Sequence, residues 1–136
     1  MRIKRLSHVS LSSRDLAATE RFYVDVMGFE IAHEFRDPAG ERYGFFLHAG
    51  GGTYIECFLG EPAAAAAGAF RHMCFEVDDI AGFAARLKAH GIADVVPRRG
   101  RTDRVLQLAF TGPDGIEVES HQHDEQSALK PFLPED

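Results

Sequence analysis

One short pattern occurs twice in this chain: a strand-like segment that carries a histidine, then polar residues able to start a helix, then an amphipathic helix. The first copy contains His8 and the second contains His72. In each copy polar and apolar residues alternate with the period of a half-buried strand, so the histidine lies opposite the apolar face. Two copies of one unit within 136 residues predict two similar modules that build one site.

The first module is predicted to have the order β-α-β-β-β, beginning with a strand over residues 3–11. Ser12 or Ser13 can cap the helix that follows, and Asp15 suits its first turn. Gly28 is expected to end this helix. Turn-forming sequences separate three further strands, which we expect at residues 29–35, 43–48 and 53–59.

The second module repeats this order from Phe70, with Asp78 expected to cap its helix and Gly91 to end it. The strands that follow are expected at residues 92–96, 105–110 and 116–121. The predicted fold is α+β: two tandem βαβββ modules in one domain, whose sheets curl around a cavity when helices cover their apolar faces. The expected segments are 1–60 for the first module, 61–69 for an alanine-rich connector, 70–123 for the second module and 124–136 for a loosely packed tail.

The composition narrows the function classes. The formal net charge is −6, which disfavours a phosphate backbone as partner, and no run of about 18 apolar residues is present to span a membrane. We therefore expect a cytoplasmic protein whose partner is a small molecule, and neither nucleic acid nor a membrane. Cys57 and Cys74 lie in strand-like segments and are expected to be buried thiols without a disulfide.

Four arginines crowd residues 98–104, a segment that Pro97 and Gly100 mark as a loop. Guanidinium groups at such a place could meet a carboxylate or phosphate of a small substrate. Charge runs on a surface are usually solvated, and we favour the interpretation that these arginines contact nothing.

The candidate site comes from the repeat. Nearly the same number of residues separates His8 from Glu56 as separates His72 from Glu119, and each carboxylate points away from the apolar face of its strand, as the histidines do. Imidazole nitrogen and carboxylate oxygen suit Ni, Zn, Co, Mn or Fe, so the four residues are candidate ligands of a divalent metal ion. A five- or six-coordinate ion would keep a position open for chemistry.

The other histidines lack such partners in the repeat. A single histidine on a polar strand face is usually solvent-facing, and His33, His48 and His90 are assigned to the surface or to loops. His121 is in phase with Glu119 on the last strand and could orient or replace a ligand. Glu117 shares that face and could do the same or meet solvent.

These features resemble the vicinal oxygen chelate superfamily, which includes glyoxalase I, bleomycin resistance proteins and extradiol dioxygenases. The resemblance covers nearly the whole chain as far as His121. In the first module it rests on His8-Val9-Ser10-Leu11 before Arg14-Asp15-Leu16, on Phe22-Tyr23 and on Gly28-Phe29. In the second it rests on His72 through Asp78-Asp79-Ile80 and on Gly112-Pro113-Asp114-Gly115 before Glu119.

Within the superfamily, the ligand order His8, Glu56, His72 and Glu119 is similar to that of bacterial, nickel-type glyoxalase I. This likeness implies a divalent-metal-dependent lyase or isomerase that acts on a small hydroxy-carbonyl substrate, free or linked to a thiol carrier or CoA, through a metal-stabilised enediolate. Glu119 or Glu56 would move the proton. The resemblance also implies a homodimer.

Three other functions are also compatible with these residues. His8, His72 and Glu119 form the two-histidine, one-carboxylate set of a non-haem Fe(II) dioxygenase of the extradiol type. The second is an enzyme like methylmalonyl-CoA epimerase, whose ligand set is also similar, although those enzymes often carry glutamine where Glu56 stands. The third is a non-catalytic protein that binds small molecules, as resistance proteins of this superfamily do.

Overall fold

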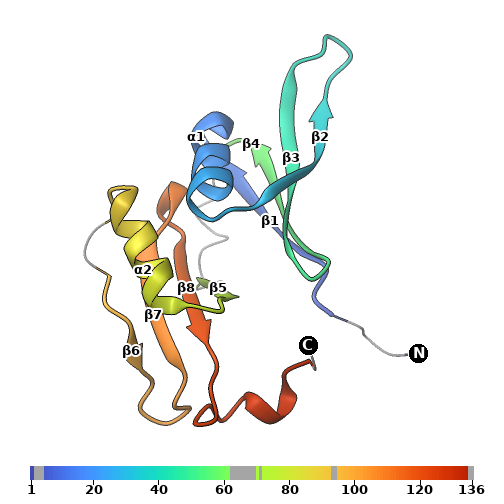
Figure 1. Ribbon diagram of the computed structural model, residues 1–136. Helices are drawn as coiled ribbons and strands as arrows, with labels where there is room; N and C mark the ends of the chain where they lie inside the picture. Colours follow the sequence, from blue (N-terminus) through green and yellow to red (C-terminus); the bar gives the residue numbers. More distant parts are fainter. Residues whose placement is uncertain (2–4, 62–69, 71, 93–94, 135–136) are drawn as a thin grey trace. The chain divides into compact units, whose positions relative to one another are not determined.

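The computed structural model describes residues 1, 5–61, 70, 72–92 and 95–134. The chain divides into two compact units, Met1–Ala69 and Phe70–Asp136. Each unit contains one four-stranded sheet, and the elements of each follow the order β-α-β-β-β (Figure 1). The predicted α+β class and the two βαβββ modules are therefore confirmed. The connector at 62–69 lies outside the described residues.

The first unit contains β1 (His8–Ser13), β2 (Glu30–Arg36), β3 (Arg42–Gly50) and β4 (Thr53–Leu59), in the sheet order β1-β4-β3-β2. β1 pairs with β4 in parallel, whereas β3 pairs antiparallel with both β2 and β4. The helical segment consists of α1 (Leu16–Glu20) and a π-helical continuation, η1 (Arg21–Val26). First and last strands thus lie side by side, which brings His8 and Glu56 onto neighbouring strands.

The helix of the first unit starts two or three residues later than predicted. Asp15 is the N-cap, and its Oδ1 accepts a hydrogen bond of 3.0 Å from the backbone N–H of Ala18. Ser13 is occupied elsewhere, because its buried hydroxyl lies 2.7 Å from that of Thr19. The predicted cap at Ser12 or Ser13 is therefore wrong. Ser13, the last residue of β1, uses its hydroxyl to contact the side chain of Thr19 within the helix.

The second unit contains β5 (His72–Glu76), β6 (Arg98–Arg99), β7 (Leu106–Thr111) and β8 (Glu117–Gln122), in the sheet order β5-β8-β7-β6. β5 and β8 are parallel, and the other two pairs are antiparallel. The helix α2 (Ile80–Ala89) lies against β7 and β8, as Figure 1 shows. Two short 3₁₀ turns, η3 (Pro113–Gly115) and η4 (Lys130–Phe132), complete the unit.

Two predictions for the second unit are wrong in detail. Asp79, not Asp78, caps α2, because only Asp79 is placed to accept a 3.0 Å hydrogen bond from the N–H of Gly82. The strand expected at residues 92–96 is absent from the described part of that segment, and β6 forms instead just after Pro97, where a loop was expected. Proline has no N–H for a sheet ladder, so the pairing starts beyond it.

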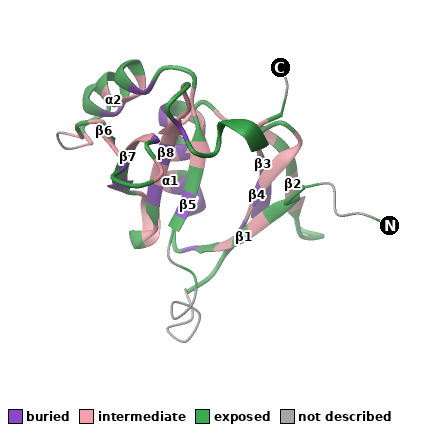
Figure 2. Ribbon diagram, turned by 90° about the horizontal axis from the view of Figure 1, so that it is seen from below, coloured by how far each residue is buried: buried purple, intermediate pink, exposed green. Residues whose placement is uncertain are grey.

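The core of each unit lies on the helix-covered face of its sheet. Buried residues, purple in Figure 2, alternate with exposed or half-buried ones along the strands. Burial of each large apolar side chain stabilises the fold by about 1.5–3 kcal/mol. The buried hydrophobic residues of the strands are Phe45, Leu47, Ile55 and Cys57 in the first unit, and Met73, Leu108, Phe110 and Val118 in the second. Candidate site residues therefore lie on the opposite, open faces.

The arginine segment contacts the chain rather than solvent alone. Arg99 donates to the carboxylate of Asp124, with Nη2 and Oδ2 2.7 Å apart, and Arg104 donates to Gln126 at 3.2 Å. The favoured interpretation of arginines without contacts is wrong for these two. These contacts fix the start of the tail, which was expected to pack loosely. Ser127 is buried, and the N–H of Ala128 donates to the carbonyl of Asp103.

Among the residues that the structure describes, no helix has the length and apolar composition needed to cross a bilayer.

Candidate metal centre

The open face of the second sheet carries a concentrated set of donor side chains. In the parallel pair of β5 and β8, His72 lies beside Glu117, Cys74 beside Glu119 and Glu76 beside His121. The residues between them, such as Met73 and Val118, are buried on the helix side. Because side chains alternate along a strand, all the donors of both strands project to the same face.

Glu119 lies between two imidazoles. Its Oε2 atom is 3.5 Å from Nε2 of His72 and 3.6 Å from Nε2 of His121. Both distances are longer than a good N–H···O hydrogen bond. They are close to the spacing of about 3.3 Å between two donors that are bound at about 2.0–2.1 Å to one tetrahedral ion. The sheet therefore holds these groups in a geometry that suits a shared cation.

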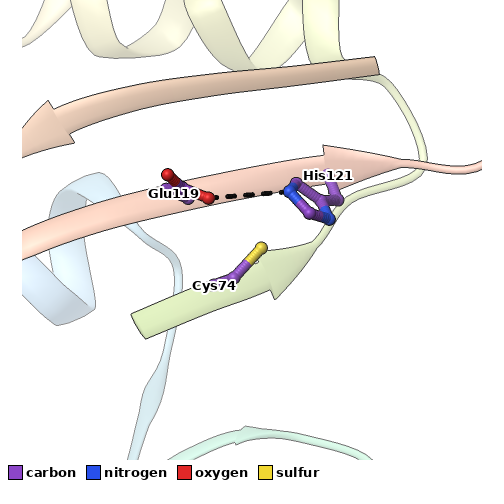
Figure 3. A group of neighbouring side chains, drawn as sticks. All are labelled: Cys74, Glu119 and His121. Atoms are coloured by element: carbon purple, nitrogen blue, oxygen red, sulfur yellow. Dashed lines mark ion pairs between the residues drawn. The ribbon is translucent and has the colours of Figure 1, made fainter. Parts of the chain in front are cut away.

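Two overlapping groups of three donors result, and in each group the donor atoms lie within 4.8 Å of one another. The first group is His72, Glu117 and Glu119, and the second is Cys74, Glu119 and His121. Figure 3 shows the second group, with Glu119 and His121 extending from β8 and Cys74 from the adjacent strand. Glu119 belongs to both groups and is the central donor of this face.

His121 provides a direct test of whether a cation fits. Its Nε2 atom is shielded from solvent and has no hydrogen-bond partner among the described residues. A buried polar atom without a partner is costly, and an ion bound beside Glu119 would remove that cost. The donor set of imidazole nitrogen and carboxylate oxygen agrees with a borderline divalent metal.

Cys74 is exposed as a residue, which contradicts the prediction of a buried thiol, whereas Cys57 is buried as predicted. The pKa of the Cys74 thiol is raised from 9.0 to about 12, first by desolvation and then by the negative charges of Glu119 and Glu76. The thiol is therefore protonated near neutral pH in the absence of a cation. Sequence reasoning did not assign Cys74 to a site, although its phase with His72 on an alternating strand would have indicated it.

The first unit repeats the relation between histidine and carboxylate. His8 lies beside Tyr54, and Ser10 beside Glu56, so His8 and Glu56 are on one face and two residues apart in register. His72 and Glu119 have the same offset on β5 and β8. The internal repeat is thus a repeat of strand register, and in each unit the structure places the two predicted ligands on the same face of adjacent strands.

The first unit differs in what surrounds its pair. The positions of Glu117, Cys74 and His121 are taken in the first unit by Tyr54, Ser10 and Phe58, according to the strand registers. No group of three metal donors is found among the described residues of the first unit. The β1–β4 pair offers the imidazole of His8 and the carboxylate of Glu56, whereas the two donor groups of the β5–β8 pair together contain five donors.

Aromatic rings cover much of the open face of the first sheet. The ring of Phe35 lies 5.5 Å from that of Phe46 and 5.1 Å from that of Phe58, and Phe46 also contacts Tyr54 at 6.0 Å. Gly44 makes room for this layer, because a Cβ there would lie 2.5 Å from the Phe58 ring. The same layer reaches the candidate ligand His8, whose ring meets the Phe46 ring edge-on at 5.5 Å.

The remaining histidines occupy varied places. His33 is exposed on β2, and His90 is exposed at the C-terminal end of α2, as expected for surface residues. His48 does not fit that assignment, because it lies half-buried in β3 and its Nε2 accepts a hydrogen bond from the N–H of Gly52 at 3.4 Å.

Comparison with known proteins agrees with this architecture. The family model described as "Glyoxalase/Bleomycin resistance protein/Dioxygenase superfamily" matches residues 5–120 of the sequence. The chain is similar to the uncharacterized protein YaeR of Escherichia coli (strain K12), with 29% identity over 88% of this chain and 97% of YaeR. Among solved structures it resembles a glyoxalase family protein from Enterococcus faecalis, with 28% identity, a TM-score of 0.70 and coverage of 87% of this chain and 97% of that one. It also resembles TnmS3, an antibiotic binding protein from Streptomyces sp. CB03234, with 25% identity, a TM-score of 0.69 and coverage of 91% and 99%.

Proposed function

The chain belongs to the glyoxalase/bleomycin resistance protein/dioxygenase superfamily, and from this premise we propose that it is a divalent-metal-dependent lyase or isomerase of a small hydroxy-carbonyl substrate. The observation that carries the proposal is the position of Glu119 on the open face of the second sheet, with one carboxylate oxygen between the imidazoles of His72 and His121. Such a cluster offers both metal ligands and a base.

The proposed ligands are His8, Glu56, His72 and Glu119, and the ion is Ni, Zn, Co, Mn or Fe. The support is chemical and topological: all four side chains are of types that these ions prefer, and the two pairs have the same register in the two units. His8 and Glu56 would come from the same chain as the second pair or from a second copy in a homodimer.

The proposed reaction moves a proton between adjacent carbons of the substrate. A bound divalent cation would stabilise the negative charge that develops on oxygen when a proton leaves the neighbouring carbon. Glu119 would accept this proton and return it to the next carbon. Its side chain is 22% exposed, so it is accessible to a substrate yet held by the sheet.

The test is metal analysis followed by reconstitution. Protein purified without chelator would be assayed for bound metal, stripped, and reloaded with each of the five ions. Turnover would be measured without oxygen on hydroxy-carbonyl compounds, both free and linked to glutathione or CoA. We expect turnover with at least one ion. Activity that requires O₂ would instead favour the extradiol type of dioxygenase, and proton exchange confined to a CoA ester would favour the epimerase type.

The aromatic layer of the first sheet favours a second candidate function, the non-catalytic binding of a planar small molecule. Aromatic faces stack on planar ligands, and the similar protein TnmS3 is named as an antibiotic binding protein. Calorimetry with 2,3-dihydroxynaphthalene as the probe would test this function. Three results together would favour the binding function over the enzyme. The probe would bind tightly at one molecule per chain, and no ion would support turnover. Phe46→Ala would weaken binding, whereas the control Phe132→Ala would not.

A further inference from the structure

The second unit holds more metal donors than the internal repeat explains. The repeat accounts for His72 and Glu119, which have counterparts in the first unit. Cys74 and His121 have none, because Ser10 and Phe58 occupy the matching positions. Both extra donors nevertheless face Glu119, one from the adjacent strand and one from the same strand (Figure 3).

The spacing of these groups suits an ion better than a hydrogen bond. Nε2 of His121 and Oε2 of Glu119 are 3.6 Å apart, and the Cys74 sulfur lies within 4.8 Å of a donor atom of each of these two residues. Donors that share a tetrahedral zinc ion lie about 3.3–3.7 Å apart, given bonds of about 2.0–2.3 Å. Small rotations of three side chains on two paired strands would therefore be sufficient to close around one ion.

The burial of His121 also supports a bound ion at this position. Its side chain is 18% exposed, and Nε2 is shielded from solvent without a hydrogen-bond partner among the described residues. A buried ring nitrogen is unfavourable without a partner, whether it carries a lone pair or an N–H, unless a ligand or a hydrogen-bonding group lies beside it.

We propose that Cys74, Glu119 and His121 form a second metal position, which takes a thiophilic divalent ion such as Zn²⁺ and shares Glu119 with the His72 position. A thiolate donor gives it a preference for Zn²⁺ over hard ions such as Mg²⁺ and Mn²⁺. On binding, the S–H bond of Cys74 breaks, a sulfur–metal bond forms and the proton goes to the buffer. No electron is transferred, and a water molecule completes four coordination.

This position does not depend on the proposed enzymatic reaction, since all three donors belong to the second unit and binding can be observed without a substrate. The probe is Co²⁺, which shows a thiolate-to-metal charge-transfer band in the near ultraviolet only when sulfur is bound. Titration of the metal-free full chain is expected to give this band with the intensity of one sulfur-bound ion per chain. Cys74→Ser should abolish it, and His121→Gln should weaken Co²⁺ binding at least about tenfold.

Two matched controls define the position. Cys57→Ser removes the buried thiol of the first unit and should leave the band unchanged, and His72→Ala should also retain it. In the wild-type protein, Zn²⁺ should slow alkylation of Cys74 by iodoacetamide at least about tenfold, as followed by peptide mass spectrometry, which does not depend on any variant folding. The proposal would be overturned if the wild-type protein lacked the band, or if Zn²⁺ left the alkylation rate unchanged. It would also be overturned if the band persisted in Cys74→Ser or was lost in His72→Ala.

Discussion

Cys74 on β5 lies in register with Glu119 on β8, and both side chains project from the face opposite the buried core. In the first unit the equivalent register partner of Glu56 is Ser10. At this register position the second unit therefore has a sulfur where the first unit has a hydroxyl oxygen.

Removal of either predicted histidine ligand should lower the metal content. His8→Ala and His72→Ala each lose one neutral nitrogen donor, and we expect metal affinity to fall by more than about tenfold. Equilibrium dialysis followed by elemental analysis would measure it. His33→Ala is the control, because His33 is exposed on β2. If His33→Ala lost as much metal as His8→Ala, assignment of ligands by the internal repeat would be wrong.

Glu119→Gln should separate binding from proton transfer. The amide keeps the size of the side chain and one coordinating oxygen but cannot act as a base, so turnover should fall by about a hundredfold or more. Metal content should fall less. Glu56→Gln is expected to be the milder change. Both variants would be assayed at matched metal occupancy, and full activity of Glu119→Gln beside an inactive Glu56→Gln would reverse the two roles.

Gly44→Ala should destabilise the first unit. The new Cβ would lie 2.5 Å from the Phe58 ring and 2.6 Å from the carbonyl oxygen of Cys57, so strand or ring must shift, at a cost of about 1–3 kcal/mol. Urea unfolding would measure the loss. Gly60→Ala is the matched control, since nothing lies within 4 Å of its Cβ position. Equal midpoints for the two variants would contradict the close packing of Phe58 on β3.

The ion pair of Asp124 with Arg99 should make stability depend on pH in acid. The pKa of Asp124 is lowered from 3.8 to about 2, chiefly by the hydrogen bond from Arg99. A folded-state pKa below the unfolded one contributes stability above pH 3.8, and this contribution is lost as pH falls towards about 2. Urea midpoints of Asp124→Asn should converge with those of wild type over this interval. Curves that stay parallel over this interval would show that ionisation of Asp124 does not contribute to stability.

The chain is expected to be a homodimer. Each sheet ends in edge strands that can pair or be covered in an assembly. Sedimentation at tens of micromolar protein would report the mass, and a purely monomeric species would remove this prediction. The metal ligands of the second unit would not be affected by that result.

The sequence by itself determined the repeated module, the order of its elements and the face of each strand that carries polar residues. These features follow from local patterns: alternation selects strands, helical spacing selects helices, and glycine marks the turns. His72 and Glu119 could be selected as partners because both halves of the chain repeat the same spacing. The matched strand registers of the two units show why that spacing is meaningful.

Only the tertiary structure decided which groups meet. The pairing of Asp124 with Arg99, the cap by Asp79 rather than Asp78, and the position of Cys74 beside Glu119 all depend on how segments distant in sequence, or competing neighbours, are placed. Strand register is set by the burial of Met73 and Val118 on the far side of the sheet, and a slip by one residue would turn every donor to the other face. Local patterns assign side chains to a face, but long-range packing determines which residues of two strands become neighbours.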